Sequence, residues 1–62
     1  MSDVIPRRPG ESWREVVARL ARDHGVEREA IDAFDYEIRH GRSQSDAARF
    51  VLMVEFEIEV IT

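Results

Sequence analysis

The chain has 62 residues and no cysteine, with 44% hydrophobic and 35% charged residues and a formal net charge of −4. This composition is typical of a folded soluble protein, and it excludes disulfides and thiolate–metal sites. A chain this short buries only about 60% of the surface that its unfolded form exposes, so we expect a single domain that gains stability from self-association or a partner protein.

Nothing along the chain predicts insertion into a membrane or export. The longest uninterrupted apolar run is the five residues Phe50 to Val54, far short of the roughly 20 that span a bilayer. Residues 1–10 contain no apolar stretch typical of a signal peptide. We therefore expect a cytoplasmic protein with no membrane partner.

The negative charge is concentrated in the second half of the chain. Residues 26–40 carry five acidic residues against two arginines, a net charge of −3, and residues 41–62 carry four against two, a net charge of −2. All nine basic residues are arginines. This distribution predicts an acidic surface formed by the second half.

The first residues predict an arm without regular structure. Pro6 and Pro9 each block a helix and restrict the residue before them, and Gly10 adds conformational freedom. We therefore expect residues 1–11 to form a flexible arm and residues 12–62 to form a single small helical domain.

The next segment predicts a helix from about residue 12 to residue 24. Ser12 and Glu15 have the spacing of a capping box, in which each side chain accepts a hydrogen bond from the other residue's amide. Gly25 is a typical left-handed stop, after which Val26 can pack back on the last turn. The apolar stripe consists of Trp13, Val16, Val17, Leu20 and Ala21. We interpret Trp13 as a core residue, with an interface anchor as the alternative.

A second helix is expected from about residue 27 to residue 40. Acidic residues occupy its first turn, where the helix dipole favours them, and Arg39 and His40 close it before Gly41. Its core stripe consists of Ala30, Ile31, Phe34 and Ile38. A weaker second stripe, which either meets a partner or packs beneath the arm, consists of Ala33, Tyr36 and His40.

The last segment carries two conflicting periodicities. Ser43 and Ser45 are both suitable helix caps, and the helical stripe that follows consists of Ala47, Phe50, Val51, Val54 and Ile58. Residues 54–60 also alternate strictly between apolar residues and glutamates, which is the period of a strand. We expect a helix to about residue 56 and leave the last five or six residues open. The predicted fold class is all-α, a small three-helix bundle with an irregular N-terminal arm and a C-terminal tail helix or short strand.

The corner between the first two helices resembles a helix-turn-helix motif. The residues that carry the resemblance are Leu20, Ala21, Gly25, Val26, Ile31 and Phe34. The resemblance implies that the second helix enters the major groove of DNA. That helix, however, displays four carboxylates and only Arg28 near its start, whereas DNA affinity comes largely from lysine and arginine. His24 also stands at a position that is usually apolar in the motif.

The acidic surface favours a protein partner over DNA, because a face of carboxylates can imitate a phosphate backbone. In size and charge alone, the chain is similar to small acidic phage proteins that inhibit host nucleases, including several anti-CRISPR types. We therefore predict a non-enzymatic inhibitor or regulator encoded by a phage or mobile element. As a DNA mimic, it would dock on the basic surface of a host protein or nucleic-acid-binding complex. The expected contact residues are Glu29, Asp32, Asp35, Tyr36, Glu55, Glu57 and Glu59.

A solvated surface without a partner is the other interpretation of these acids. The i, i+4 pairs Arg28–Asp32 and Asp35–Arg39 are expected to neutralise part of the second helix. The three glutamates of residues 55–59 either keep an apolar tail soluble or form an acidic rim around it.

Two further functions stay open, and neither is enzymatic. The first is a DNA-binding regulator or antitoxin of helix-turn-helix shape, with phosphate contacts from Arg7, Arg8, Arg14 and Arg42. The second is a homodimeric assembly module held by Phe50, Phe56 and Ile58. An enzyme is not expected, because no activated nucleophile, phosphate loop, zinc spacing or calcium loop is recognisable. No cofactor or metal site is predicted either.

Overall fold

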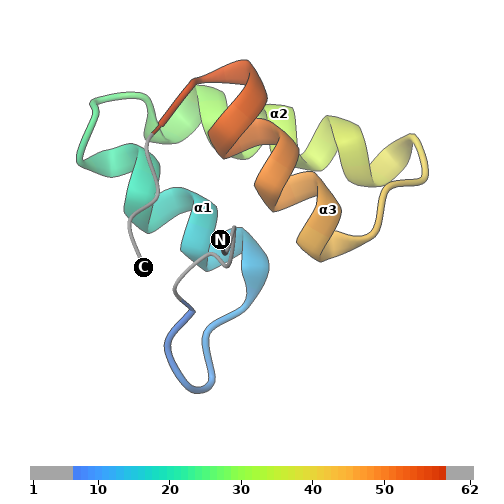
Figure 1. Cartoon of the computed structure of the whole chain (residues 1–62), viewed down its shortest axis with the longest axis horizontal. Helices are drawn as coiled ribbons and strands as arrows, with labels where there is room; N and C mark the ends of the chain where they lie inside the picture. The colour runs from blue at the N-terminus through green and yellow to red at the C-terminus, as the bar shows by residue number, and fades with distance from the viewer. Residues whose placement is uncertain (1–6, 59–62) are drawn as a thin grey trace.

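The computed structural model describes residues 7–58, and all regular structure in this range is helical. The elements are α1 (Trp13–Arg22), α2 (Glu27–Arg39), α3 (Gln44–Arg49) and η1 (Phe50–Glu55). In Figure 1, η1 continues α3 as one rod, which we call the third rod. The rods α1 and α2 and the third rod pack against one another. The predicted small three-helix bundle is therefore confirmed. No helix in the described range is long and apolar enough to cross a membrane.

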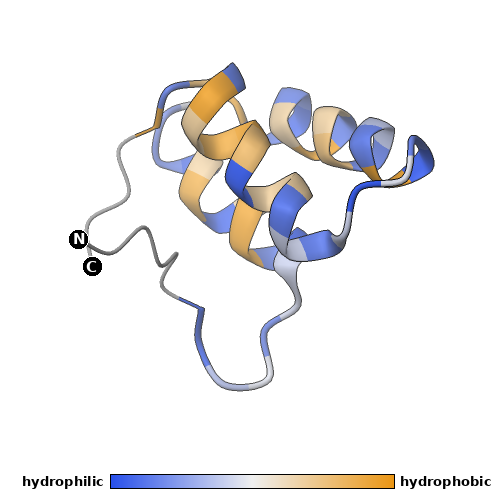
Figure 2. Ribbon diagram, turned by 45° about the vertical axis from the view of Figure 1, so that its right-hand side comes forward, coloured by the Kyte–Doolittle hydropathy of each residue, from blue (hydrophilic) through white to orange (hydrophobic). Residues whose placement is uncertain are grey.

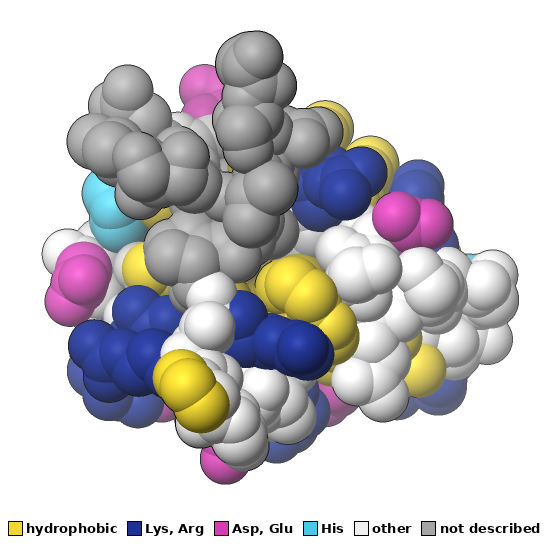
Figure 3. All heavy atoms as spheres, turned by 60° about the horizontal axis from the view of Figure 1, so that its bottom comes forward, with side chains coloured by type: hydrophobic (Ala, Val, Ile, Leu, Met, Phe, Trp, Pro, Cys, Tyr) yellow, Lys and Arg dark blue, Asp and Glu magenta, His cyan; other side chains and the backbone are white. Residues whose placement is uncertain are grey.

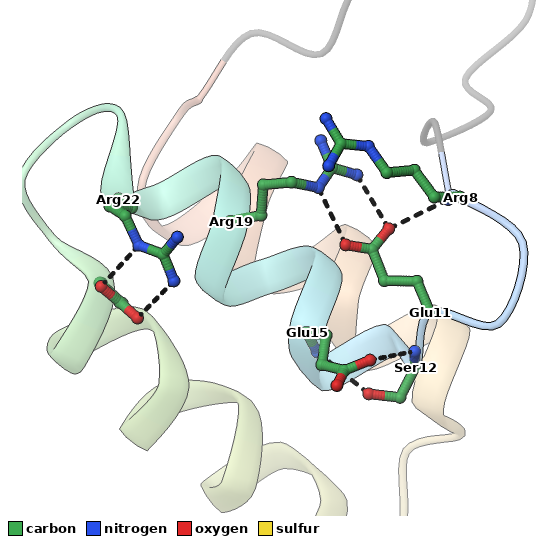
Figure 4. Close-up of polar contacts among 7 residues, drawn as sticks. Arg8, Glu11, Ser12, Glu15, Arg19 and Arg22 are labelled. Carbon is green, nitrogen blue, oxygen red and sulfur yellow. Dashed lines mark hydrogen bonds and ion pairs between the residues drawn. The ribbon is translucent and has the colours of Figure 1, made fainter.

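α1 begins at the predicted capping box. The Glu15 amide donates a hydrogen bond of 3.1 Å to Ser12 Oγ, and the Ser12 amide donates one of 2.9 Å to Glu15 Oε1 (Figure 4). After the helix, Gly25 takes φ +74°, a left-handed conformation that most side chains disfavour. The Val26 amide then donates to the Ala21 carbonyl over 3.1 Å, which satisfies a carbonyl at the helix end. Both signals predicted for the ends of this helix are confirmed.

α2 begins without a side-chain cap, because Val26 stands at the N-cap position. Glu27 and Glu29 lie in its first turn, where carboxylates interact favourably with the positive end of the helix dipole. Ala30 and Phe34 are buried on its inner side. A short connection then turns the chain back, so that α3 packs against both α1 and α2.

The third rod is capped by Ser43, not Ser45. The Asp46 amide donates to Ser43 Oγ over 3.3 Å. From Phe50 onward the backbone widens into a π-helix, and at its end the Phe56 amide donates to the Val51 carbonyl, five residues earlier, over 3.0 Å. The helical structure ends at Glu55, in agreement with the expected end near residue 56. The strand alternative is not adopted by residues 54–58, and the rest of the tail, residues 59–62, lies outside the described residues.

The core draws on all three rods, and Figure 2 shows hydrophobic residues on each of them. Its buried residues are Val16, Val17, Ala21, Ala30, Phe34, Ala47, Ala48, Val51, Leu52 and Ile58. Val54, which the helical stripe places in the core, is instead 59% exposed, whereas Leu52 is fully buried. The physical reason is that a π-turn holds more residues than an α-turn, so positions after Val51 rotate off the stripe of an α-helix.

The described part of the alternating tail, residues 54–58, bends back onto the core and does not form a strand. Glu57 has φ +52° and is the one non-glycine residue in the described range with a positive φ. Beyond it, the Ile58 amide donates to the Leu52 carbonyl over 2.6 Å, and the Ile58 side chain is only 5% exposed. Phe56 packs partly against the same core. Phe56 and Ile58, which stand before and after Glu57, thus both contact the core, because the left-handed conformation of Glu57 bends the backbone between them.

Candidate protein-docking surface

Two ion pairs fasten α1 to α2. Arg14 donates from Nε and Nη2 to the two carboxylate oxygens of Asp35, over 3.0 and 2.9 Å. Arg22 holds Glu27 through two hydrogen bonds of 3.0 Å. Hydrogen bonds from these arginines lower the pKa of both carboxyls below their ordinary values. Both carboxylates are therefore engaged inside the protein.

Three more arginines are paired with carboxylates. These pairs are Arg19–Glu11, Arg42–Glu37 and Arg49–Asp46. Arg42 lies 2.6 Å from its partner oxygen and also covers the Phe50 ring, 4.2 Å from the ring centroid. The acidic charge of α2 is thus reduced chiefly by arginines from outside that helix. In particular, Asp35 forms its hydrogen bonds with Arg14 of α1, and Arg39, the partner suggested by its i, i+4 spacing, acts on Asp35 only as a more distant charge.

The predicted contact residues divide according to this pairing. Asp35 is engaged and only partly exposed. Within residues 7–58, four of the predicted carboxylates are exposed and form no ion pair, namely Glu29, Asp32, Glu55 and Glu57. Glu59 lies outside the described residues. The carboxylates that remain for a partner therefore come from the outer side of α2 and from the end of η1.

Four exposed side chains follow one another along the outer side of α2, at spacings of three, four and four residues. They are Glu29, Asp32, Tyr36 and His40, and we call them the α2 edge. Tyr36 is 52% exposed, although its ring centroid lies 4.1 Å from that of His40, with the planes inclined by 32°. His40 Nδ1 lies 2.9 Å from the Tyr36 carbonyl oxygen, which holds the imidazole beside the phenol ring.

Arg28 and Arg39 are also exposed on α2. On a helix with 3.6 residues per turn, both arginines lie on the same side of Asp32 as Asp35. This side faces α1, because Asp35 binds Arg14 of α1 there. Tyr36 and the rest of the α2 edge lie on the other side of Asp32 by the same geometry. Arg28 and Arg39 therefore flank Asp32 on the side of α1, whereas Glu29, Tyr36 and His40 lie on its other side, so the α2 edge is the acidic and aromatic side of α2.

A contact that the sequence did not predict fastens residues 8–11 to α1. Pro9 and Gly10 occupy the centre of a reverse turn, in which the Glu11 amide donates to the Arg8 carbonyl over 3.0 Å. The Glu11 carboxylate accepts hydrogen bonds from the Arg8 amide and from the Arg19 guanidinium (Figure 4). These bonds, chiefly those from Arg19, lower the pKa of Glu11 from 4.5 to about 2. Pro9 and Gly10 predicted irregular structure here but not this turn, and no local pattern identified Arg19 as the partner.

The arginines considered for DNA phosphates occupy different environments. Arg14 and Arg42 are engaged in the ion pairs described above. The Arg7 guanidinium lies over the Trp13 ring, 4.7 Å from its centroid, and Arg8 is exposed beside the turn. Figure 3 views the molecule from the side of this turn and shows arginine side chains gathered there. Trp13 itself is only partly buried, at the margin of the core.

The residues considered for a homodimer largely face the protein's own interior. Ile58 belongs to the core, and Phe56 packs partly against it. Phe50 is half-buried beneath the Arg42 guanidinium. Of the large hydrophobic residues in the described range, only Tyr36 and Val54 are strongly exposed.

The described residues enclose no pocket and bring no three potential metal ligands together. No protein-family model matches the chain, and no match is found among the curated proteins or the solved structures.

Proposed function

We propose that the protein is a non-enzymatic binding module that docks the α2 edge on a basic surface of another protein, with Glu55 and Glu57 extending the acidic contact. One observation carries the proposal. Five arginines engage five acidic residues within the fold, whereas the carboxylates of Glu29 and Asp32 stay exposed and unpaired beside an exposed Tyr36.

Two physical effects support this use of the surface. Unpaired carboxylates attract a basic partner over a distance and orient it as it approaches. Tyrosine then supplies contact area at a small cost in conformational entropy, and it is enriched at the centre of protein interfaces. Tyr36 meets this requirement, because the imidazole of His40 already supports its ring. The α2 edge therefore offers both long-range attraction and a short-range anchor.

The size and charge of the chain support a specific form of this proposal. A 62-residue protein with a net charge of −4 fits an inhibitor or regulator that occupies the phosphate-binding surface of a nucleic-acid-binding protein. Such a protein would compete with nucleic acid through its carboxylates, in the manner of small acidic inhibitors encoded by phages or mobile elements. The partner would then be released by salt and displaced by DNA.

Direct binding of nucleic acid is the second candidate. It is favoured by the arginines around the N-terminal turn, which Figure 3 shows on one face. Within the described residues, Arg7 and Arg8 form no ion pair, so their guanidinium groups are available to phosphates. We rank this candidate second because Arg14 and Arg42 are already paired and the α2 edge presents the carboxylates of Glu29 and Asp32.

The test is a pull-down with tagged protein from nuclease-treated bacterial lysate, eluted in a salt series. The decisive variant is Asp32→Lys, and Asp23→Lys is the matched control, because it makes the same charge change at an exposed, unpaired residue in the turn before α2. Asp35 is unsuitable, since a lysine there would stand next to Arg14 and destabilise the fold. We expect the wild type and Asp23→Lys to retain a basic nucleic-acid-binding protein that added DNA displaces, and Asp32→Lys to lose it.

Two results would contradict the proposal. Retention of the same protein by Asp32→Lys would exclude the α2 edge as the contact. Recovery of nucleic acid alone, from lysate that has not been treated with nuclease, would favour the second candidate.

A further inference from the structure

The α2 edge combines two groups that recognise the same chemistry. Tyr36 offers the face of an aromatic ring, and Asp32, one helical turn earlier, offers a carboxylate without an ion pair in the described range. A guanidinium is planar, stacks on aromatic faces and forms two parallel hydrogen bonds with a carboxylate. An ammonium is a point charge, which neither stacks as a plane on a ring nor forms two parallel hydrogen bonds with one carboxylate. The pair of groups therefore favours arginine over lysine.

His40 determines which face of the Tyr36 ring is available. Helical side chains lean toward the N-terminus, so Tyr36 leans toward the turn of Asp32, and His40 leans onto Tyr36. The two rings are in contact at 4.1 Å, and the hydrogen bond between His40 Nδ1 and the Tyr36 carbonyl oxygen holds the imidazole in place. The ring face that stays exposed is thus the one on the Asp32 side.

The chain's own arginines leave this position open. Within residues 7–58, neither Arg28 nor Arg39 forms an ion pair with Asp32, and neither lies over the Tyr36 ring. Arg14 is held by both oxygens of Asp35, and Asp32 acts on it only as a more distant charge. The Arg14–Asp35 pair shows that an aspartate of α2 can bind a guanidinium through two hydrogen bonds. We infer the same kind of contact for Asp32.

Resting on the proposed function, we propose that Tyr36 and Asp32 form a receiving site for one arginine side chain of the protein partner. The guanidinium stacks on the exposed face of Tyr36 and pairs with the Asp32 carboxylate. Glu29, three residues before Asp32 on the same side of the helix, accepts a neighbouring basic residue of the partner.

The experiment compares hexa-arginine and hexa-lysine peptides at equal ionic strength. Each is titrated into ¹⁵N-labelled full-length protein, and amide chemical shifts report the site and the Kd. We expect hexa-arginine to shift residues 29–40 and to bind at least about threefold more tightly than hexa-lysine. Tyr36→Leu should weaken hexa-arginine binding by roughly three- to tenfold, whereas Tyr36→Phe should preserve it. Because Tyr36 is exposed, the unchanged spectrum of the core residues serves as the control for folding.

The outcomes separate this inference from the proposed function. If the two peptides bind equally at α2, or if Tyr36→Leu binds like the wild type, the arginine site is overturned and the acidic docking surface remains. If neither peptide shifts the α2 amides, both the arginine site and the docking surface are overturned.

Discussion

Glu11 shows how one side chain joins the arm to the bundle. Its carboxylate accepts hydrogen bonds from Arg19 and from the Arg8 amide, and its side chain is only 13% exposed. The sequence predicted an arm without regular structure, and residues 7–11 are indeed irregular, but the turn within them is held by these contacts. The folded protein therefore stabilises the ionised form of Glu11.

This coupling predicts a dependence of stability on pH. The pKa of Glu11 is about 2 in the folded protein and 4.5 in its ordinary state, so the contribution is complete above pH 4.5 and is lost as the pH falls toward 2. We expect the wild type to have a higher Tm than Glu11→Gln at pH 6, and the difference to disappear near pH 2. Thermal unfolding followed by circular dichroism measures this. A Tm difference of constant size across the range would show that the carboxylate charge is not its source.

The left-handed conformation of Glu57 predicts a stabilising substitution. A side chain at φ +52° is strained, and glycine adopts this conformation without that cost. Glu57→Gly should raise the free energy of unfolding by about 0.5–1 kcal/mol, measured by urea denaturation. Glu55→Gly removes the same charge two residues earlier, within η1, and should lower it by about 1 kcal/mol. Equal effects of the two variants would contradict the assigned conformation.

The N-terminal cap of α3 leads to a prediction about the stability of this helix. Ser43 accepts the hydrogen bond from the Asp46 amide, whereas Ser45 lies inside α3 and makes no capping bond. Ser43→Ala should therefore lower the free energy of unfolding by about 1 kcal/mol. Ser45→Ala should change it by less than about 0.5 kcal/mol, because alanine suits a helix interior. Chemical denaturation of the two variants decides between the caps, and a larger loss in Ser45→Ala would reverse the assignment.

The third rod also shows the limit of periodicity. Its sequence fits a helical stripe and a strand alternation, and the two patterns place different residues in the core. The structure fits neither throughout, because the widened turns of η1 bury Leu52 and expose Val54. Leu52 is buried in the core that α1 and α2 supply, and the local spacing of apolar residues does not show this contact.

The way the bundle buries its tail leads to a prediction about the whole molecule. Ile58 packs into a core made by all three rods, so Ile58 and Phe56, two of the three residues considered for a homodimer, already contact the core of their own chain. We expect the Tm of the wild type to be independent of protein concentration, as measured by calorimetry over a hundredfold dilution. Ile58→Ala should lower the free energy of unfolding by about 2–4 kcal/mol. A Tm that rises with concentration would instead favour the homodimeric assembly module.

Much of this protein follows from local sequence signals. The capping box at Ser12, the stop at Gly25 and the stripe around Val16 identify α1 without further information, because caps and turns involve residues only a few positions apart. The exposed carboxylates Glu29 and Asp32 also follow from helical period alone. The all-α class and the order of the helices were thus determined by the sequence.

The tertiary structure alone decided which charges are available. Asp35 and Glu29 look alike in the sequence, yet Asp35 is held by Arg14, twenty-one positions away, and Glu29 is not paired within the described residues. The choice depends on how α1 and α2 cross, which brings one carboxylate within hydrogen-bond reach of a guanidinium and leaves the other in solvent. The same holds for the widened turns of η1 and the burial of Ile58. These features arise from packing between segments distant in the chain, where local spacing carries no information.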